Sequence, residues 1–207
     1  MSQCVFCDEF EDGSDRVIWE DDEWVVLPGK GAFVPGYCLL LSVACVKSFS
    51  YLPSAQLRRA DGVVERVRQV IADHYGRPVV VAEHGVDASC PYLGSACCTD
   101  HNHLHFFPLP KGVNPEEVEK MYVEMGGAAR SHESLAELTG HAGAYLLLSP
   151  TPGRYLIWQW DERFGKQYAR RVVAGLGGES RWDWRRHPFP ENMQETVDVL
   201  RHLPRPW

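Results

Sequence analysis

HNHLHFFP, residues 101–108, is the segment that most constrains the fold of this chain. Polar and apolar residues alternate along it, which is typical of a β-strand that has one face in a core. On such a strand, the side chains of His101, His103 and His105 all project to one face. Neighbouring imidazoles then lie about 7 Å apart along the strand. The segment therefore predicts a row of histidines on one face of a sheet.

A row of imidazoles has two chemical uses. Neutral imidazole is a common metal ligand, and it is also a nucleophile that a neighbouring ring can orient or supply with a proton. Because its pKa is about 6.5, most of it is free base at neutral pH, and phosphorus is a fitting electrophile. The alternative is a polar strand face that is merely rich in histidine. Since a half-buried imidazole costs free energy unless it has a partner, the pattern favours a chemical role.

The composition is that of a globular protein with one core. The 207 residues are 44% apolar and 24% charged, and no apolar run approaches the roughly 18 residues of a membrane span. The N-terminal segment 1–15 lacks the apolar stretch of a secretory signal, so we expect a cytoplasmic protein without a membrane partner. Acidic residues outnumber basic ones by 28 to 21, which disfavours nucleic acid as a partner.

Cysteines are frequent, with seven in the chain. In a reducing compartment they indicate metal ligands or reactive thiols before disulfides, and an odd number would leave one unpaired. CVFC at positions 4–7 has the C-x2-C spacing with which two thiolates bind one tetrahedral ion. Two unrelated terminal thiols are the alternative. Cys97 and Cys98, with Cys90, form a rival ligand set, although adjacent cysteines chelate one ion poorly.

Hydrophobic periodicity predicts an α+β fold with a mostly antiparallel sheet flanked by helices. Strands are expected within 16–27, at 36–43, 79–82 and 101–108, and in a hairpin of 145–149 with 155–160. Helices are expected from an N-cap at Ser54 to Gly76, from Asn114 onward, and over 164–176 and 190–203. We predict a catalytic domain over 1–112 and a C-terminal α/β extension, 113–207, packed on the same core.

HNHLHFFP resembles the histidine triad of the HIT superfamily, His-x-His-x-His followed by two apolar residues. The upstream segments VIWEDDEWVVL and VPGYCLLLSVACVKSFSYL are similar to its first hairpin and to its proline-glycine strand with the turn into the long helix. The resemblance covers roughly residues 4–110 and implies a HIT-like sheet. Beyond it, the chain looks like larger HIT-like proteins that carry a C-terminal extension.

The resemblance implies a reaction class, cleavage or exchange of a bond at the α-phosphorus of a nucleotide. His103 would attack and form a nucleotidyl-histidine, and His105 would contact phosphate oxygens or relay a proton. A histidine at the third position favours hydrolysis of a small nucleotide conjugate. The alternatives are a nucleotidyl transferase or phosphorylase, a non-enzymatic nucleotide-binding protein, and a hydrolase with a catalytic metal on the histidines. Many HIT proteins form homodimers, but the extension could instead complete the pocket within one chain.

The resemblance also implies a zinc site similar to that of galactose-1-phosphate uridylyltransferase. The positions that match its ligands are Cys4, Cys7, Cys45 and His101. Cys45 replaces a more usual histidine, but thiolate is an equally good ligand. Four protein ligands close the coordination sphere, so this Zn²⁺ would be structural. If His101 binds zinc, the triad's working pair is His103 and His105.

Candidate substrate contacts come from the segments around the triad and from the extension. They are Glu83, His84, Ser95, Thr99, Gln167 and Arg170. Glu83 and His84 match a segment of the larger HIT-like proteins, or simply begin a loop. Hydroxyls just upstream of the triad could contact phosphate. Arg170 could supply the positive charge that an acidic protein needs for a nucleotide, or lie on a solvated helix face.

Overall fold

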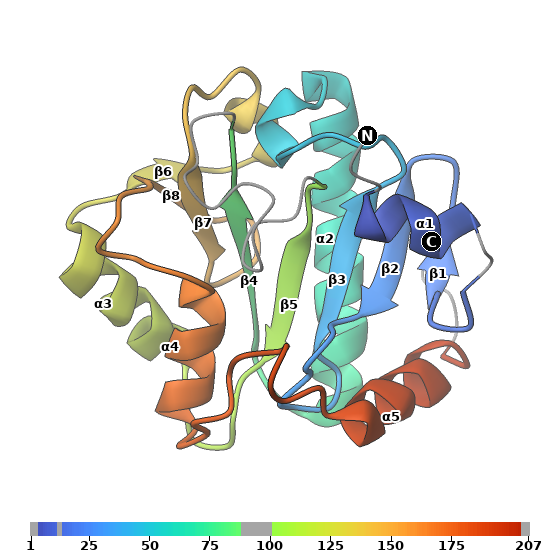
Figure 1. Ribbon diagram of the computed structural model, residues 1–207. Coiled ribbons are helices and arrows are strands. Elements are labelled where there is room, and N and C mark those ends of the chain that lie inside the picture. Colours follow the sequence, from blue (N-terminus) through green and yellow to red (C-terminus); the bar gives the residue numbers. More distant parts are fainter. Residues whose placement is uncertain (1–3, 12–13, 88–100, 204–207) are drawn as a thin grey trace.

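The computed structural model describes residues 4–11, 14–87 and 101–203. Its centre is an eight-stranded sheet of order β1-β2-β3-β5-β4-β7-β8-β6 with antiparallel neighbours (Figure 1). The strands are β1 (Trp19–Glu20), β2 (Trp24–Pro28), β3 (Cys38–Ser42), β4 (Val79–Gly85), β5 (Leu104–Pro108), β6 (Arg130–His132), β7 (Tyr145–Ser149) and β8 (Tyr155–Gln159). The helices are α1 (Val5–Glu11), α2 (Ser54–Tyr75), α3 (Pro115–Gly126), α4 (Tyr168–Leu176) and α5 (Pro190–Leu200), with short 3-10 helices η1 (Phe49–Tyr51) and η2 (Leu135–Leu138). The predicted α+β class, with an antiparallel sheet flanked by helices, is confirmed.

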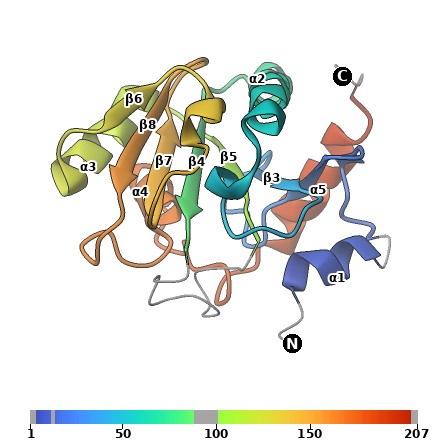
Figure 2. The ribbon, with the colours of Figure 1, turned by 90° about the horizontal axis from the view of Figure 1, so that it is seen from above.

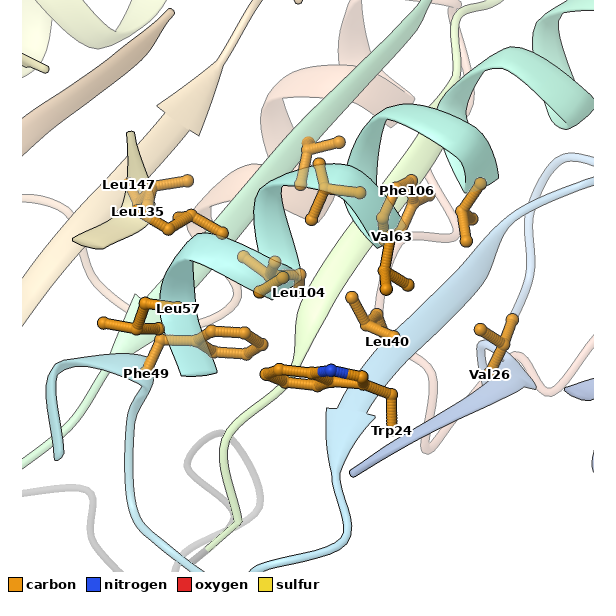
Figure 3. Close-up of a cluster of buried hydrophobic side chains, with 14 of the residues drawn as sticks. Trp24, Val26, Leu40, Phe49, Leu57, Val63, Leu104, Phe106, Leu135 and Leu147 are labelled. Atoms are coloured by element: carbon orange, nitrogen blue, oxygen red, sulfur yellow. The ribbon is translucent and has the colours of Figure 1, made fainter. Parts of the chain in front are cut away.

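The sheet has a helical layer on each face. α2 lies on one side and α4 on the other (Figure 2). On the α2 face, Leu104 and Phe106 of β5 belong to a buried cluster with Leu57 of the helix and with Trp24, whose ring stacks on Phe49 (Figure 3). On the α4 face, a second buried cluster contains residues of β5, α3 and α4. Both faces of the sheet are therefore removed from water over most of its area.

β5 lies in the middle of the sheet. His105 pairs with Leu39 of β3 on one side and with Ala82 of β4 on the other. Because side chains alternate along a strand, Leu104 and Phe106 point to the α2 face, and His105 points to the α4 face. The central position of β5 gives His105 a support of paired strands on both sides.

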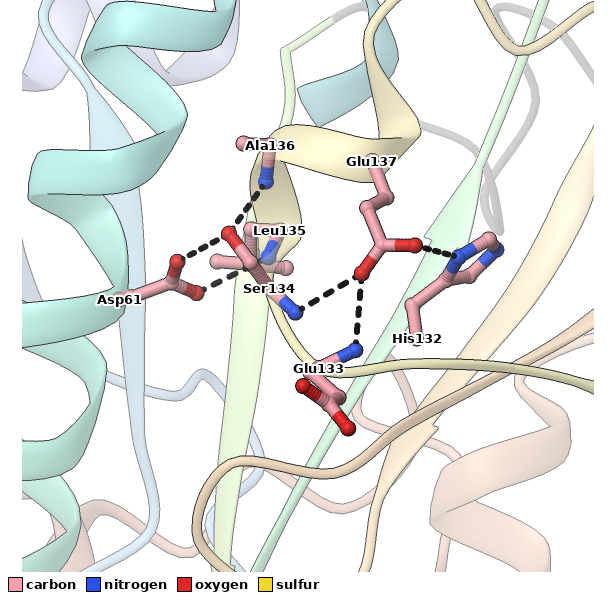
Figure 4. A network of polar contacts seen from close by, with 7 residues as sticks. All are labelled: Asp61, His132, Glu133, Ser134, Leu135, Ala136 and Glu137. Carbon is pink, nitrogen blue, oxygen red and sulfur yellow. Dashed lines mark hydrogen bonds and ion pairs between the residues drawn. The ribbon is translucent and has the colours of Figure 1, made fainter.

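The C-terminal part of the chain is fastened to α2 by a polar network (Figure 4). The Asp61 carboxylate accepts hydrogen bonds from the Ser134 hydroxyl at 2.6 Å and from the Leu135 backbone N–H at 2.9 Å. Ser134 and Glu137 form a capping box at the start of η2, and Glu137 also pairs with His132 at 2.8 Å. These contacts fix η2 against α2.

Several expected boundaries differ from the structure. Pro53 occupies the cap of α2 and Ser54 is its first helical residue, without a capping side-chain bond. The helix expected from residue 164 begins at Tyr168, because Gly165 and Gln167 have left-handed φ values of 61° and 50° that interrupt a helix. The strand expected over 101–108 begins at Leu104.

The sheet runs across the proposed boundary between residues 112 and 113. β4 pairs with β7 over five residues, from Val81↔Ser149 to Gly85↔Tyr145. Helix α5 also packs against β2, near the start of the chain. The two segments thus share one sheet, while the division into domains stays a prediction. Within the described ranges, none of the helices has both the length and the apolar character that crossing a bilayer requires.

Candidate active site and metal-ligand cluster

The residues 101–103 are anchored to the end of β3 just before β5 begins. The imidazole Nε2 of His101 lies 2.7 Å from the backbone carbonyl oxygen of Ser42. The Asn102 backbone N–H donates to the carbonyl oxygen of Val46 at 2.7 Å, and its side-chain oxygen accepts from the Ser42 N–H at 3.3 Å. His101 and Asn102 are buried. These hydrogen bonds thus hold residues 101–103, which precede the backbone pairing of β5 with its neighbouring strands.

His103 has a fixed ring orientation. Its Nδ1 lies 3.0 Å from the backbone carbonyl oxygen of His101, and a carbonyl only accepts hydrogen bonds. Nδ1 therefore carries the hydrogen, and the lone pair of the neutral ring is on Nε2. The ring packs against Phe6 of α1, with centroids 5.6 Å apart. Burial lowers the pKa of His103 to about 4, an effect that the bond to the His101 carbonyl partly offsets.

His105 lies edge-on to His103, with ring centroids 4.7 Å apart and planes inclined by 77°. The rings are closer than the spacing predicted for a regular strand, since His103 precedes β5. Nδ1 of His105 lies 2.7 Å from the hydroxyl of Tyr37, and its ring stacks on Phe107. Burial lowers the pKa of His105 well below its ordinary value, and the nearby His103, Arg170 and His84 lower it further. Both rings of the pair are partly exposed.

Arg170 lies behind His105 and is buried. Its guanidinium donates to the Tyr37 hydroxyl at 2.9 Å and to three backbone carbonyl oxygens, those of Trp182 at 2.8 Å, Gly31 at 2.5 Å and Lys30 at 3.2 Å. A guanidinium held in this way is not on a solvated helix face. Four of its five N–H groups donate to protein oxygens, and a direct substrate contact of Arg170 stays a prediction.

Four potential metal ligands come together at the N-terminal side of the triad. The cluster comprises Cys4, Cys7, Cys45 and His101, and its ligand atoms all lie within 4.8 Å of one another. The Sγ atoms of Cys4 and Cys7 are 3.4 and 3.7 Å from Nδ1 of His101. Burial and the neighbouring Cys45 and Cys4 raise the pKa of the Cys7 thiol to about 12. The structure thus brings together the four residues that the sequence nominated.

The spacing of this cluster fits a tetrahedral ion. With Zn–S of about 2.3 Å and Zn–N of about 2.0 Å, tetrahedral angles place sulfur about 3.5 Å from nitrogen. The Sγ–Nδ1 distances of 3.4 and 3.7 Å agree with this value. Nε2 of His101 donates to the Ser42 carbonyl, so the lone pair on Nδ1 faces the sulfurs. The residues present could therefore hold a metal ion.

Glu83 and His84 lie on opposite faces of β4. The Glu83 carboxylate is buried on the α2 face, where it accepts from the Phe49 N–H at 3.0 Å and from the Tyr145 hydroxyl at 2.6 Å. The sheet therefore separates this carboxylate from the histidine pair, while a role of Glu83 in substrate binding stays a prediction. His84 points to the triad's face and stacks on Trp160, with centroids 5.7 Å apart. Burial, followed by the charge of His103, lowers the pKa of His84 to about 4.

The remaining predicted substrate contacts are Ser95, Thr99 and Gln167. Ser95 and Thr99 lie outside the described residues, as do Cys90, Cys97 and Cys98 of the rival ligand set. Gln167 precedes α4 in a left-handed conformation, and its side-chain nitrogen is 3.4 Å from an Asp183 carboxylate oxygen. A role for Gln167 in substrate binding stays a prediction.

Sequence reasoning missed three residues that shape the site: Tyr37, Asn102 and Phe6. Tyr37 sits in an apolar run, and only the pairing of β3 with β5 places its hydroxyl beside His105. Asn102 lies between two triad histidines and has the ordinary appearance of a polar strand residue. The C-x2-C spacing around Phe6 indicated metal binding but not a helix that packs against the triad.

The comparisons with protein-family models and with curated proteins find no match to this chain. Among solved structures, a Hit-like protein involved in cell-cycle regulation from Bartonella henselae is 14% identical, with a TM-score of 0.45 over 55% of this chain and 84% of that one. A hypothetical histidine triad nucleotide-binding protein from Sulfolobus tokodaii is 18% identical, with a TM-score of 0.45 over 53% of this chain and 71% of that one. The yeast Ap4A phosphorylase in complex with AMP is 15% identical, with a TM-score of 0.42 over 83% of this chain and 75% of that one. Likeness of this extent says nothing of the chemistry of this chain.

Proposed function

We propose that this protein is a nucleotide hydrolase of the histidine-triad type, which cleaves nucleotide conjugates at the α-phosphorus through a nucleotidyl intermediate on His103. The observation that carries the proposal is the 3.0 Å contact between Nδ1 of His103 and the carbonyl oxygen of His101. It places the lone pair of a partly exposed ring on Nε2, which is the state that a nucleophile needs. The resemblance of the motif to the HIT triad supports a nucleotide as the substrate.

The reaction has two steps. Nε2 of His103 forms a bond to phosphorus while the bond from phosphorus to the leaving-group atom, oxygen or nitrogen, breaks, and the leaving group departs with that electron pair. The nucleotidylated ring keeps its hydrogen on Nδ1 and is positively charged, so the His101 carbonyl dipole stabilises it. Water then attacks phosphorus, the N–P bond breaks, its electron pair returns to Nε2, and the proton of the attacking water passes to the solvent. His105, next to His103, would contact the phosphoryl oxygens.

The same proposal assigns a structural Zn²⁺ to Cys4, Cys7, Cys45 and His101. The interatomic distances and the donor set of three thiols and one imidazole suit that ion. Bound there, zinc would supply no activated water, because four protein ligands fill its coordination sphere. It would tie α1, and with it Phe6, to His101, which lies two residues before His103. A rigid position of His103 is what an in-line attack requires.

The decisive experiment is a search for the covalent intermediate. The purified protein is mixed with dinucleoside polyphosphates, nucleotide sugars, phosphoramidates and nucleoside phosphosulfates, quenched without acid, and weighed intact by mass spectrometry. We expect an adduct with the mass of a nucleotidyl group that is absent from His103→Ala and present in His74→Ala, whose ring is exposed at the end of α2.

Each outcome of this experiment has one reading. An adduct that persists in His103→Ala, or turnover by that variant near the wild-type rate, overturns the covalent assignment. Nucleotide binding without any adduct or turnover overturns it in favour of a non-enzymatic nucleotide-binding protein. An adduct that is discharged by phosphate or a sugar phosphate, and not by water, retains the intermediate but replaces hydrolysis by transfer or phosphorolysis.

A further inference from the structure

A chain of hydrogen-bonding groups leads from α4 to the histidine pair. The Arg170 guanidinium donates to the Tyr37 hydroxyl at 2.9 Å, and the same hydroxyl lies 2.7 Å from Nδ1 of His105. Tyr37 and Arg170 are 1% and 3% exposed, so water does not compete for these contacts. The guanidinium also lies over the Tyr37 ring, 5.2 Å from its centroid. The orientation of the phenol is therefore fixed from two directions.

The chemistry of the three groups gives this chain a direction. A guanidinium has only donors, so one lone pair of the phenol oxygen accepts from Arg170. Burial raises the pKa of Tyr37, so its hydroxyl keeps its hydrogen. That hydrogen then points at Nδ1 of His105, the second group bonded to the oxygen. If Nδ1 of His105 carried the hydrogen instead, the Tyr37 oxygen would accept from both Arg170 and His105. The hydroxyl's own hydrogen would then bond to neither of these two groups.

We infer that Tyr37 is a positioning residue, which holds His105 in the tautomer with its hydrogen on Nε2. The inference rests on the proposed function in one respect, since it assigns this N–H to the phosphoryl oxygens of the nucleotide. His103 is held in the other tautomer, with its hydrogen on Nδ1. The two neighbouring rings thus carry complementary groups, a lone pair on one Nε2 and an N–H donor on the other.

This assignment gives the C-terminal extension a part in the site. Arg170 belongs to α4, while Tyr37, His103 and His105 belong to the N-terminal segment. Arg170 does not touch the phosphate in this arrangement. It acts on His105 through Tyr37, which explains why a guanidinium is buried beside a cluster of histidines. Removing the Tyr37 hydroxyl leaves Arg170 with its three backbone carbonyls, so Tyr37→Phe is expected to keep the fold.

The test compares Tyr37→Phe with Tyr122→Phe. Tyr122 is also a buried tyrosine of the α4-face cluster, but within the described residues its hydroxyl makes no hydrogen bond. Long-range ¹H–¹⁵N correlation spectra of the purified full-length protein report the tautomer of each imidazole, and the signals of His105 are assigned by their loss in His105→Asn. We expect the Nε2–H tautomer in the wild type and in Tyr122→Phe, and a mixture of tautomers in Tyr37→Phe.

Kinetics supply the second measurement. For a substrate that forms the adduct, kcat of Tyr37→Phe should fall about 10- to 100-fold, because a misoriented group loses catalysis without losing binding. KM should change by less than about threefold, and Tyr122→Phe should match the wild type. A wild-type tautomer of His105 in Tyr37→Phe, or an Nδ1–H tautomer in the wild type, overturns the inference. The spectra need no substrate, so failure of the proposed function and failure of this inference can be told apart. If the adduct is lost from His103→Ala while Tyr37→Phe keeps wild-type kinetics, the proposed function stands and only the inference about Tyr37 is overturned.

Discussion

The carbonyl oxygen of Ser42 accepts a hydrogen bond from Nε2 of His101 at 2.7 Å, while Nδ1 of the same ring faces the sulfurs of Cys4 and Cys7. The last residue of β3 thus decides which nitrogen of His101 faces the cysteines. A backbone group is a robust choice for this task, since substitution of Ser42 leaves its carbonyl in place. The orientation of the potential ligand is built into the sheet itself.

The first prediction concerns the metal. Cys7→Ala should abolish stoichiometric zinc in the purified protein and lower the midpoint of thermal unfolding, because an ion that binds only the native state stabilises it by mass action. Elemental analysis and a thermal melt with and without a chelator measure both effects. Cys38→Ala is the matched control, since Cys38 is buried in the α2-face core away from the cluster. Wild-type zinc content in Cys7→Ala would refute the four-ligand assignment.

The second prediction concerns Asn102. Asn102→Ala removes the acceptor for the Ser42 N–H and should lower the free energy of unfolding by about 1–3 kcal/mol, the cost of an unsatisfied buried group. Formation of the adduct on His103 should slow as well, because Asn102 lies between the two histidines that define its geometry. Urea denaturation and the mass-spectrometric time course give the two numbers.

Asn114 provides the control for that experiment. Asn114→Ala removes the N-cap of α3, whose side chain accepts from the Glu117 N–H at 2.9 Å. It should cost about 0.5–2 kcal/mol of stability, similar to the first variant. The rate of adduct formation should not change, since this cap is remote from the triad. Equal slowing in both variants would show that Asn102 acts through stability alone.

The third prediction is a pH dependence of stability that comes from Glu83. Burial raises its pKa to about 7, although the Tyr145 hydroxyl and the Phe49 N–H favour the carboxylate. The pKa of Glu83 is higher in the folded than in the unfolded chain, so the folded state binds more protons between about pH 4.5 and 7. Its contribution to stability is therefore present at low pH and is lost as the pH rises through 7. His141, whose ring contacts Tyr145, is a further titratable group beside this pair among the described residues.

Glu83→Gln tests that sign. The amide cannot ionise, so the variant should gain stability relative to the wild type on going from pH 5 to pH 8, by up to about 3 kcal/mol. Denaturant titrations at both values of pH measure the difference. Glu117→Gln is the control, since that exposed side chain caps α3. An unchanged or opposite difference between wild type and Glu83→Gln would contradict the raised pKa.

The fourth prediction separates the two faces of β5. Leu104 is completely buried under α2, so Leu104→Ala should cost about 2–5 kcal/mol through the cavity that it leaves. At temperatures where the variant is folded, we expect the tautomer of His105 and kcat to stay as in the wild type, because His105 points to the other face. Val43→Ala, at a position that is 45% exposed, should change the stability little. A large loss of kcat in folded Leu104→Ala would show that the two faces are coupled.

Local sequence patterns are sufficient to predict much of the fold and part of the site. The alternation in HNHLHFFP predicts both the strand and the face on which His105 lies, because burial of Leu104 and Phe106 leaves no other orientation. The order of strands and helices predicts an antiparallel sheet with helical layers. The C-x2-C spacing predicts that Cys4 and Cys7 approach one ion, and the structure places both near His101.

Other features depend on contacts that no local pattern contains. The sequence predicts both Glu83 and His84 near the substrate, because it predicts a strand that ends at residue 82. β4 continues to Gly85, so the two side chains alternate and only His84 faces the triad. The charge of Arg170 alone predicts a contact with a nucleotide, but whether its guanidinium is solvated depends on the backbone carbonyls of the segments around Gly31 and Trp182. Arg170 and the segment around Gly31 are so far apart in the sequence that no periodic pattern predicts their contact.

The position of β4 has a consequence for self-association. Its backbone is paired with β5 along one edge and with β7 along the other. A second copy cannot add a strand there. Among the strands of the described residues, the two outermost, β1 and β6, are those with an edge at which the sheet could continue. These are short, with two and three residues, and offer a partner chain few hydrogen-bonding groups. The chain's own β7–β8 hairpin thereby covers the edge of β4 that does not pair with β5.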